Sequence, residues 1–340
     1  MNDTPDPGSV RPIAVLVDRE GLGDSLLKFP FLRAIHHTGR PGKPRRIATH
    51  QTSMANELAP FVRGLIDRVI DHAGLTGKSR EVRDRLKALP PFDLVFDSRT
   101  HLASVVLARA LLTRNAYYCC LPGYALSDRR PPGRFARPDG IAARMLSLAE
   151  AALDGPADWQ GTLDVSPAAR ALAEQRLPGG PRYVGLATGS REPRKNWPVE
   201  RYIALAQGLA AAGRQPVFLI GPQERDLLER LRAAAPFALY PEATPPDPSL
   251  GLARLELAIA LCRRLEAAVA NDSGIGHLLG AIGTPLVSLF GPTDAARWAP
   301  FTAAGIVVRA QEFGGTAMDA IPVDAVLNAV ERLPRGGGAQ

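Results

Sequence analysis

The sequence predicts an α/β protein with two doubly wound parallel-sheet domains that face each other. Apolar segments rich in strand-forming residues alternate with helical patterns, which is typical of parallel sheets with crossover helices. The alternation restarts after a linker near residues 155–165, so domains of residues 1–165 and 166–340 are expected. With 340 residues, 46% of them hydrophobic, the chain is long enough for two ordinary cores.

The first domain is expected to begin with a buried strand and a turn that contains glycine. Its strands are predicted where short runs of Val, Ile, Leu and Phe occur, at 12–18, 45–50 and 92–98. Its helices are predicted at 25–39, 101–112 and 141–153. The stretch 121–140 is rich in Pro, Gly and Arg, so a loop is expected there.

The second domain begins with a helix-start signal, because Ser166 is suited to an N-cap and Pro167 to the first helical position. Gly213 is placed to close a later helix. Strands are predicted in the segments 182–190, 215–221, 266–273 and 285–291. Helices are predicted at 166–177, 198–213, 223–235, 249–264, 277–283 and 323–333.

The formal net charge is +7, and the first 165 residues carry 23 basic against 18 acidic side chains. A basic cluster at 39–46 could attract phosphates or anionic lipid headgroups, or be a solvated surface. Aromatic residues are sparse and do not alternate with the basic ones, so no nucleic-acid partner is expected. The three cysteines, the lack of an apolar run of membrane-spanning length and the polar first residues predict a cytoplasmic protein.

The segment 271–277 follows a predicted strand and contains Asp272, Ser273, Gly274 and His277. A helix N-terminus offers free N–H groups and partial positive charge, and glycines let a ligand approach the backbone. Together with the hydroxyl and the imidazole, this set is suited to a pyrophosphate. An Asp N-cap with incidental glycines is the alternative, but it leaves the histidine unexplained.

A second segment, 187–202, also joins a strand to a helix. It contains the hydroxyls of Thr188 and Ser190 and the fixed cation of Lys195. Hydroxyls and cations at such a turn form a phosphate-binding arrangement, although a solvated basic loop has the same composition. Two such segments in one domain favour a phosphorylated or nucleotide ligand.

Several carboxylates follow strands and are candidates for chemistry. Asp24 lies after Gly21 and Gly23, where it could be an N-cap or, across a cleft from the nucleotide, a general base. The third glycine of the dinucleotide fingerprint is missing, which disfavours a dehydrogenase. Asp18 and Asp97 are weaker candidates for that cleft, and Glu224 could bind a ribose diol. No Asp-x-Asp pair or His/Cys cluster suggests a metal site.

Four segments together make the chain resemble glycosyltransferase family 9, the ADP-heptose:lipopolysaccharide heptosyltransferases. These are "GLGDSLLKFPFLRAI", "FDLVFDSRTHLASVVLARAL", "SREPRKNWPVERY" and "NDSGIGHLLGAIGTPLVSLFGPTD". The match runs in order over roughly 12–333, and the last segment is the most specific. Ser273 stands where Thr is frequent in the family, and residues 119–140 match no part of its pattern.

The resemblance implies a GT-B fold and an inverting, metal-independent transfer from a nucleotide sugar, ADP-heptose, to a lipopolysaccharide-core or related glycan acceptor. The first domain would bind the lipid-linked or oligosaccharide acceptor, with Asp24 as the base, and the second domain would bind the donor. By the same resemblance, Glu224 would bind the ribose of the donor and Asp272 the hydroxyls of its sugar. The donor phosphates would be bound by Thr188, Ser190, Lys195, Ser273, Gly274 and His277.

Other functions are compatible with the same residues. The protein could be a family member that uses another nucleotide sugar, or a non-catalytic nucleotide-sugar-binding protein. An epimerase of similar fold would need further cleft carboxylates, for which Asp18 and Asp97 are the candidates. Peripheral contact with the anionic inner surface of the cytoplasmic membrane is also expected, through the basic first half.

Overall fold

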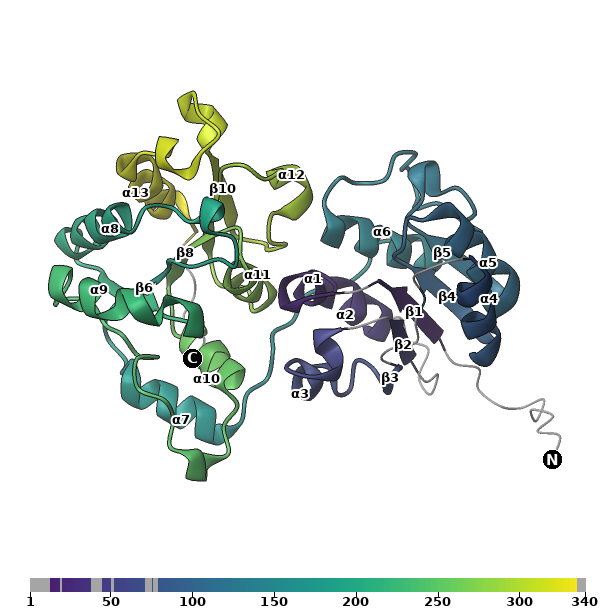
Figure 1. Cartoon of the computed structure of the whole chain (residues 1–340), viewed down its shortest axis with the longest axis horizontal. Coiled ribbons are helices and arrows are strands. Elements are labelled where there is room, and N and C mark those ends of the chain that lie inside the picture. Colours follow the sequence, from purple (N-terminus) through teal and green to yellow (C-terminus); the bar gives the residue numbers. More distant parts are fainter. Residues whose placement is uncertain are drawn as a thin grey trace. The chain divides into compact units, whose positions relative to one another are not determined.

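The computed structural model describes residues 13–18, 20–37, 45–49, 52–70, 75 and 79–334. The chain divides into two compact units, residues 1–160 and 161–340, and each contains a parallel five-stranded sheet with helices around it (Figure 1). Of the basic cluster at 39–46, residues 39–44 lie outside the described residues. No helix in the described part of the chain has the length and apolar composition needed to cross a membrane.

The amino-terminal unit has the strand order β3-β2-β1-β4-β5. The strands are β1 Ile13–Val17, β2 Arg45–Thr49, β3 Arg68–Ile70, β4 Phe92–Asp97 and β5 Thr113–Cys119. The helices are α1 Leu22–Leu26, α2 Phe29–His37, α3 Ala59–Val62, α4 Ser79–Ala88, α5 Leu102–Leu112 and α6 Ile141–Leu153.

Side chains alternate between the two faces of this first sheet, and both faces are covered. On one face, Leu16 and Val95 belong to a core that α4 and α5 complete. On the other, the Phe96 ring packs edge-on against Phe31 of α2, with ring centroids 5.0 Å apart. The central strands β1 and β4 are fully buried, which explains why they are continuous apolar runs.

The carboxyl-terminal unit has the strand order β10-β9-β8-β6-β7. The strands are β6 Tyr183–Ala187, β7 Gln215–Leu219, β8 Ala267–Asn271, β9 Leu286–Phe290 and β10 Gly305–Arg309. The helices are α7 Pro167–Arg176, α8 Val199–Ala211, α9 Leu228–Ala234, α10 Arg254–Cys262, α11 Gly274–Ala281, α12 Ala295–Trp298 and α13 Val323–Arg332. Helices α8 and α13 pack closely at Gly208, where a Cβ would lie only 2.8 Å from the Leu327 side chain.

The structure confirms the predicted α/β class, and the helix-start signal at Ser166 is also correct. The Ser166 hydroxyl accepts a hydrogen bond from the backbone N–H of Ala169 at 3.2 Å. Gly213 adopts a left-handed conformation with φ of 73°, as a helix-closing residue should.

Three predicted helices differ in extent from the observed ones. The segment 25–39 contains two short helices, and Pro30 occupies the first turn of the second, where its missing N–H has no cost. Helix α10 starts only at Arg254, because Gly251 turns the chain with φ of 59° after a short 3-10 helix. The segment 223–235 begins as a 3-10 helix, Pro222–Leu227, before α9.

Candidate functional site

The predicted phosphate-binding segments meet at the carboxyl edge of the second sheet. Strands β6 and β8 are neighbours, with Ala187 opposite Ala270. The loop that follows β6 and the turn that follows β8 therefore begin side by side, although about eighty residues separate them in the sequence. Ligands of parallel α/β sheets bind at this edge.

The buried side chain of Asn271, the last residue of β8, connects these two segments. Its Oδ1 accepts a hydrogen bond from the Trp197 backbone N–H at 3.1 Å and lies 3.1 Å from the Tyr202 hydroxyl. Its Nδ2 donates to the Thr188 carbonyl at 2.9 Å. Asn271 is 1% exposed, so these bonds are made without water and fix the β6–α8 loop onto the end of β8.

Lys195 and Asp272 form an ion pair, with Nζ 3.0 Å from Asp272 Oδ2. The same nitrogen is 3.0 Å from Glu192 Oε1, and the Thr293 hydroxyl donates to Asp272 Oδ2 at 2.9 Å. Burial alone would lower the pKa of the Lys195 ammonium, but the two carboxylates raise it above its usual value. Lys195 is therefore a fixed cation at neutral pH.

Helix α11 begins with Ser273 as its N-cap, which corrects the alternative that assigned an Asp to this position. The Ser273 hydroxyl accepts from the Gly276 N–H at 3.4 Å, while the Asp272 side chain pairs with Lys195. A Cβ at Gly276 would lie 3.0 Å from the Asn271 carbonyl, so glycine allows the helix to approach β8 closely. Gly274 is the first residue of α11, and His277, 8% exposed, is the fourth.

The Glu224 carboxylate packs against the backbone of Gly189, which follows β6, and of Gly221, which follows β7. A Cβ at Gly189 would come within 1.8 Å of Glu224 Oε1, and one at Gly221 within 2.4 Å of Oε2. Burial raises the pKa of the Glu224 carboxyl, and hydrogen bonds from backbone N–H groups oppose this effect. In its present position the carboxylate leaves no room for a Cβ at either glycine.

The two hydroxyls of the β6–α8 loop differ in their surroundings. Thr188 is 3% exposed, and its Oγ1 has no hydrogen-bond partner in the described part of the chain. The Ser190 hydroxyl donates to the Glu192 carbonyl at 2.8 Å. Thr188 thus keeps a free donor at the strand edge, whereas the Ser190 proton is used within the loop.

In the amino-terminal unit, Asp24 is the third residue of α1, and Gly21 is the N-cap, so the N-cap interpretation of Asp24 is wrong. Asp24 Oδ2 accepts a long hydrogen bond of 3.4 Å from the Gly21 N–H. Lys28 Nζ donates to the Asp24 carbonyl at 3.3 Å and forms a buried ion pair with Glu20. Burial raises the pKa of the Glu20 carboxyl to about 7, although Lys28 acts in the opposite direction.

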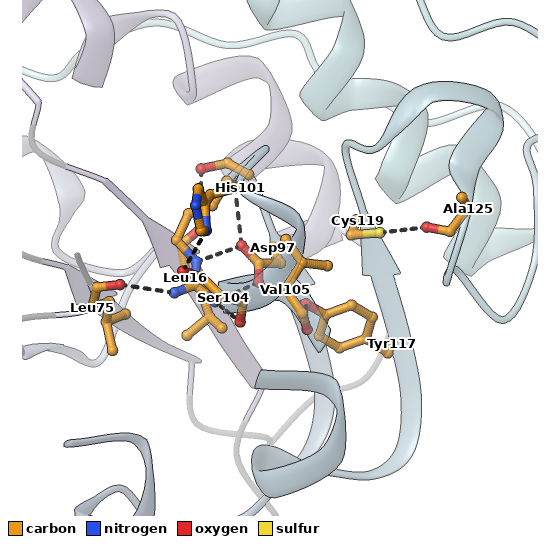
Figure 2. Close-up of polar contacts among 11 residues, drawn as sticks. Leu16, Leu75, Asp97, His101, Ser104, Val105, Tyr117, Cys119 and Ala125 are labelled. Carbon is orange, nitrogen blue, oxygen red and sulfur yellow. Dashed lines mark hydrogen bonds and ion pairs between the residues drawn. The ribbon is translucent and has the colours of Figure 1, made fainter. Parts of the chain in front are cut away.

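Asp97 is not available for chemistry, which corrects the expectation that it could face a cleft. It is completely buried, and Arg99 donates to both of its carboxylate oxygens, at 2.8 and 2.6 Å. Tyr117 of the neighbouring strand β5 donates its hydroxyl at 2.6 Å (Figure 2). Arg99 also donates to the carbonyls of Leu75 and Ser104, so this network holds the loop after β4.

No cluster of three or more His, Cys, Asp or Glu side chains in the described ranges is placed to hold a metal ion. Asp18 follows β1 directly and is exposed. The structure thus places Thr188, Lys195, Glu224, Asp272, Ser273, Gly274 and His277 along one sheet edge, with Ser190 in the adjoining loop. Asp24 belongs to the other unit.

Two parallel-sheet units, one with a fixed cation, hydroxyls and a helix N-terminus gathered at its strand ends, form the architecture expected of a GT-B glycosyltransferase. A family model described as glycosyltransferase family 9 (heptosyltransferase) matches residues 81–318. The chain therefore belongs to glycosyltransferase family 9, as its motifs predict.

Individual relatives agree with this family. The chain is 31% identical to lipopolysaccharide heptosyltransferase 1 of Pseudomonas aeruginosa over 232 residues, which cover 64% of this chain and 59% of the relative. It is 28% identical to lipooligosaccharide heptosyltransferase 2 of Haemophilus influenzae over 127 residues, 37% of this chain and 36% of that relative. The matched part thus spans about a third to three fifths of the length of these relatives.

The solved structure of ADP-heptose lipopolysaccharide heptosyltransferase II of Escherichia coli has the same fold. Its TM-score with this chain is 0.61, at 20% sequence identity, and the alignment covers 94% of this chain and 97% of that one. The expected GT-B fold is confirmed.

Four residues that support the candidate site were not identified from the sequence. Asn271 and Thr293 are a strand-end amide and a loop hydroxyl, and their roles depend on which strands are neighbours. Glu20 directly precedes the motif "GLGDSLLKFPFLRAI" and Lys28 lies within it, but nothing in this pattern indicates that two charged side chains are buried there.

Replacing Asn271 by alanine tests its role in joining β8 to the β6–α8 loop. We expect Asn271→Ala to lower the free energy of unfolding by about 3 kcal/mol, because the Trp197 N–H and the Thr188 carbonyl lose their buried partner. Urea denaturation followed by circular dichroism measures the change. Asn56→Ala is the control, since its exposed amide makes a 3.3 Å bond to Thr52. Equal effects of the two substitutions would contradict the role given to Asn271.

The buried network around Asp97 predicts a graded response. Arg99→Met should lower the free energy of unfolding by about 3–5 kcal/mol, because it leaves a buried carboxylate without its cation. Tyr117→Phe should cost about 1–2 kcal/mol, because it removes one hydrogen bond and leaves the ion pair intact. The same denaturation experiment ranks the two, and the reverse order would show that Arg99 is not the main partner of Asp97.

Proposed function

We propose that this protein transfers a heptose from ADP-heptose to a lipopolysaccharide-core or related glycan acceptor, with inversion at the anomeric carbon and without a metal ion. The observation that carries the proposal is the fixed Lys195 cation beside the N-terminus of α11, at the carboxyl edge of the second sheet. Family membership supports it, as does the name of the E. coli structural neighbour, which specifies ADP-heptose.

The donor would bind in the second unit. The diphosphate would be bound by Lys195, the hydroxyls of Thr188 and Ser273 and the α11 N-terminus, with His277 and Gly274 in the first turns and Ser190 in the adjoining loop. The partial burial of Lys195 and the free hydroxyl proton of Thr188 support these roles. Glu224 would accept hydrogen bonds from the ribose hydroxyls, and Asp272 from those of the sugar.

In the proposed reaction, Asp24 takes the proton of the acceptor hydroxyl, whose oxygen attacks the anomeric carbon opposite the nucleotide. The bond from that carbon to the phosphate oxygen breaks, and ADP leaves with the electron pair. Lys195 and the N–H groups of α11 stabilise the charge that develops on the diphosphate, a task that other transferases assign to Mg²⁺. The Lys28 ammonium, which donates to the Asp24 carbonyl and pairs with Glu20, supports a fixed position for helix α1 and the base on it.

The acceptor would be lipid-linked or an oligosaccharide and would bind to the first unit. Such an acceptor would bring the protein to the cytoplasmic face of the membrane as a peripheral enzyme. An epimerase is disfavoured, since Asp97, one of the two further carboxylates that it would use, is committed to Arg99 and Tyr117.

Thermal unfolding with ADP, UDP, GDP and their sugar conjugates tests the donor. ADP and ADP-heptose are expected to raise the melting temperature of the wild type and of Asp24→Asn, because a ligand that binds only the native state stabilises it. Lys195→Met should lose most of this shift. Arg194→Met is the matched control, because the neighbouring Arg194 pairs with Glu192 and is 64% exposed.

Transfer assays with a lipopolysaccharide-core acceptor complete the test. Asp24→Asn should keep donor binding and lose transfer by about 10²–10⁴-fold, as expected for loss of a general base. Activity that survives exhaustive chelation would support the metal-free step, and activity that chelation abolishes would refute it. Preference for UDP or GDP would indicate another nucleotide sugar, and binding of ADP-heptose without transfer by the wild type would indicate a non-catalytic binding protein.

The space around Glu224 gives a further prediction. Gly189→Ala should weaken ADP binding by about tenfold or more, because the new methyl group would displace the Glu224 carboxylate from the strand edge. Gly179→Ala is the control, because its Cβ would lie 4.0 Å from the nearest side-chain atom, in Glu174. Calorimetric titration of both variants measures the difference, and unchanged affinity in Gly189→Ala would remove Glu224 from the nucleotide site.

A further inference from the structure

We propose that residues 126–137, here called the Arg-Phe segment, dock this protein on the surface of an anionic lipid bilayer. The segment reads LSDRRPPGRFAR and follows β5. It lies within the residues that the family model matches, but none of the four family motifs includes it. This inference rests on the proposed function in one respect, that a lipid-linked acceptor draws the enzyme to a membrane. It assigns that contact to particular side chains.

The Arg-Phe segment is held firmly at both ends. The Asp128 carboxylate accepts from the Tyr117 N–H at 2.6 Å, and the Ser127 hydroxyl accepts from the Cys119 N–H at 2.9 Å. At the other end, the Arg137 guanidinium donates to the Cys120 carbonyl. The conformation of the segment is therefore fixed by the sheet edge beside it.

A tight turn in the middle of the segment presents its apolar residue. Gly133 has φ of 68°, and the Arg134 N–H donates to the Pro131 carbonyl at 3.2 Å, which is a turn with proline and glycine at its two central positions. Phe135 follows directly and is 79% exposed, more than any other large apolar side chain in the described part of the chain. A rigid turn that holds a phenyl ring in water is suited to insertion into a lipid headgroup layer.

Helix α5, which is bonded to the segment through Arg109, carries further exposed apolar side chains. The Arg109 guanidinium donates to the Leu126 carbonyl, which joins the last turn of α5 to the start of the segment. Val106, one turn before Arg109, is 46% exposed, and Leu102, one turn earlier still, is 60% exposed. Together with Phe135, these are the three most exposed large apolar side chains among the described residues.

The charge of the segment complements an anionic surface. It contains four arginines and one acidic residue, Asp128, which already pairs with Arg109. The nearest carboxylates to Arg129 and Arg134 are at 4.0 and 3.7 Å, and exposed pairs of this length add little stability. These guanidinium groups can therefore exchange their partners for lipid phosphates. A soluble anionic glycan would satisfy the arginines but would leave Phe135 in water.

Vesicle binding tests the proposal with the whole protein. Vesicles of phosphatidylethanolamine with about a third phosphatidylglycerol should bind the protein at low salt, and phosphatidylcholine vesicles should bind it at least about tenfold more weakly. Phe135→Ser should weaken binding by about tenfold through loss of ring insertion. The triple change Arg129→Gln, Arg130→Gln and Arg134→Gln should remove most of the salt-sensitive binding.

Matched substitutions in the other unit provide the control. Phe237→Ser combined with Arg230→Gln and Arg232→Gln changes a phenyl ring that is 39% exposed and two exposed arginines, and it should leave vesicle binding unchanged. Phe135→Trp reports insertion directly, since its fluorescence should be quenched by lipids brominated on the acyl chains. If Phe135→Ser does not fold, quenching in Phe135→Trp still shows whether residue 135 enters the bilayer.

Three outcomes would overturn the proposal: failure of the wild type to bind anionic vesicles, equal binding by wild type and segment variants, or no quenching of Trp at 135. Self-association that Phe135→Ser abolishes, without vesicle binding, would assign the surface to a second copy of the chain. The nucleotide-induced melting shift should be unchanged in these variants. If the wild type shows no such shift, the proposed function fails while the vesicle result stands independently.

Discussion

The carboxamide of Asn271 is the contact on which the candidate donor site depends. A single buried side chain accepts from the Trp197 backbone and donates to the Thr188 carbonyl, so it sets the path of the loop that carries Lys195. The Trp197 indole is itself buried and donates to the Ile321 carbonyl. A carboxylate or an aliphatic side chain of the same size could not supply both a donor and an acceptor here. Asparagine is thus required by the hydrogen-bonding pattern.

The position of Lys195 follows from this arrangement. Its ammonium is placed between two carboxylates, Glu192 and Asp272, and remains charged and oriented before any ligand arrives. Binding of an anion would exchange one set of negative partners for another, so little new order would have to be created in the protein. Because Lys195 is already oriented, it would need no reorganisation when negative charge develops on a leaving group during a reaction.

The strands could be predicted from the sequence because fully buried parallel strands are continuous apolar runs, as in β1, β4, β6 and β9. β3 is only three residues long and partly exposed, so it carries no comparable pattern. The split of the first helix and the late start of α10 depend on single turns near Pro30 and Gly251. Local patterns therefore located most elements but not their ends.

The candidate site was predictable by residue type but not by contact. Lys195 and Asp272 are 77 positions apart and meet because β6 lies beside β8, a neighbourhood that no local pattern encodes. For Asp97 the residue type was misleading. Its place at a strand end predicted a carboxylate open to ligand, but Arg99 and Tyr117 bind it in the core.

The bonds from Ser127 and Asp128 to β5 have one more consequence. β5 is the last strand of its sheet, and its outward N–H groups at Tyr117 and Cys119 would otherwise offer a template for a strand of another molecule. Because side chains of the same chain occupy them, an incoming strand finds no donors there, and its approach would place it against the ionic pair of Arg109 and Asp128. The segment thus also protects the sheet from edge-to-edge aggregation, a hazard for any open parallel sheet in a crowded cell.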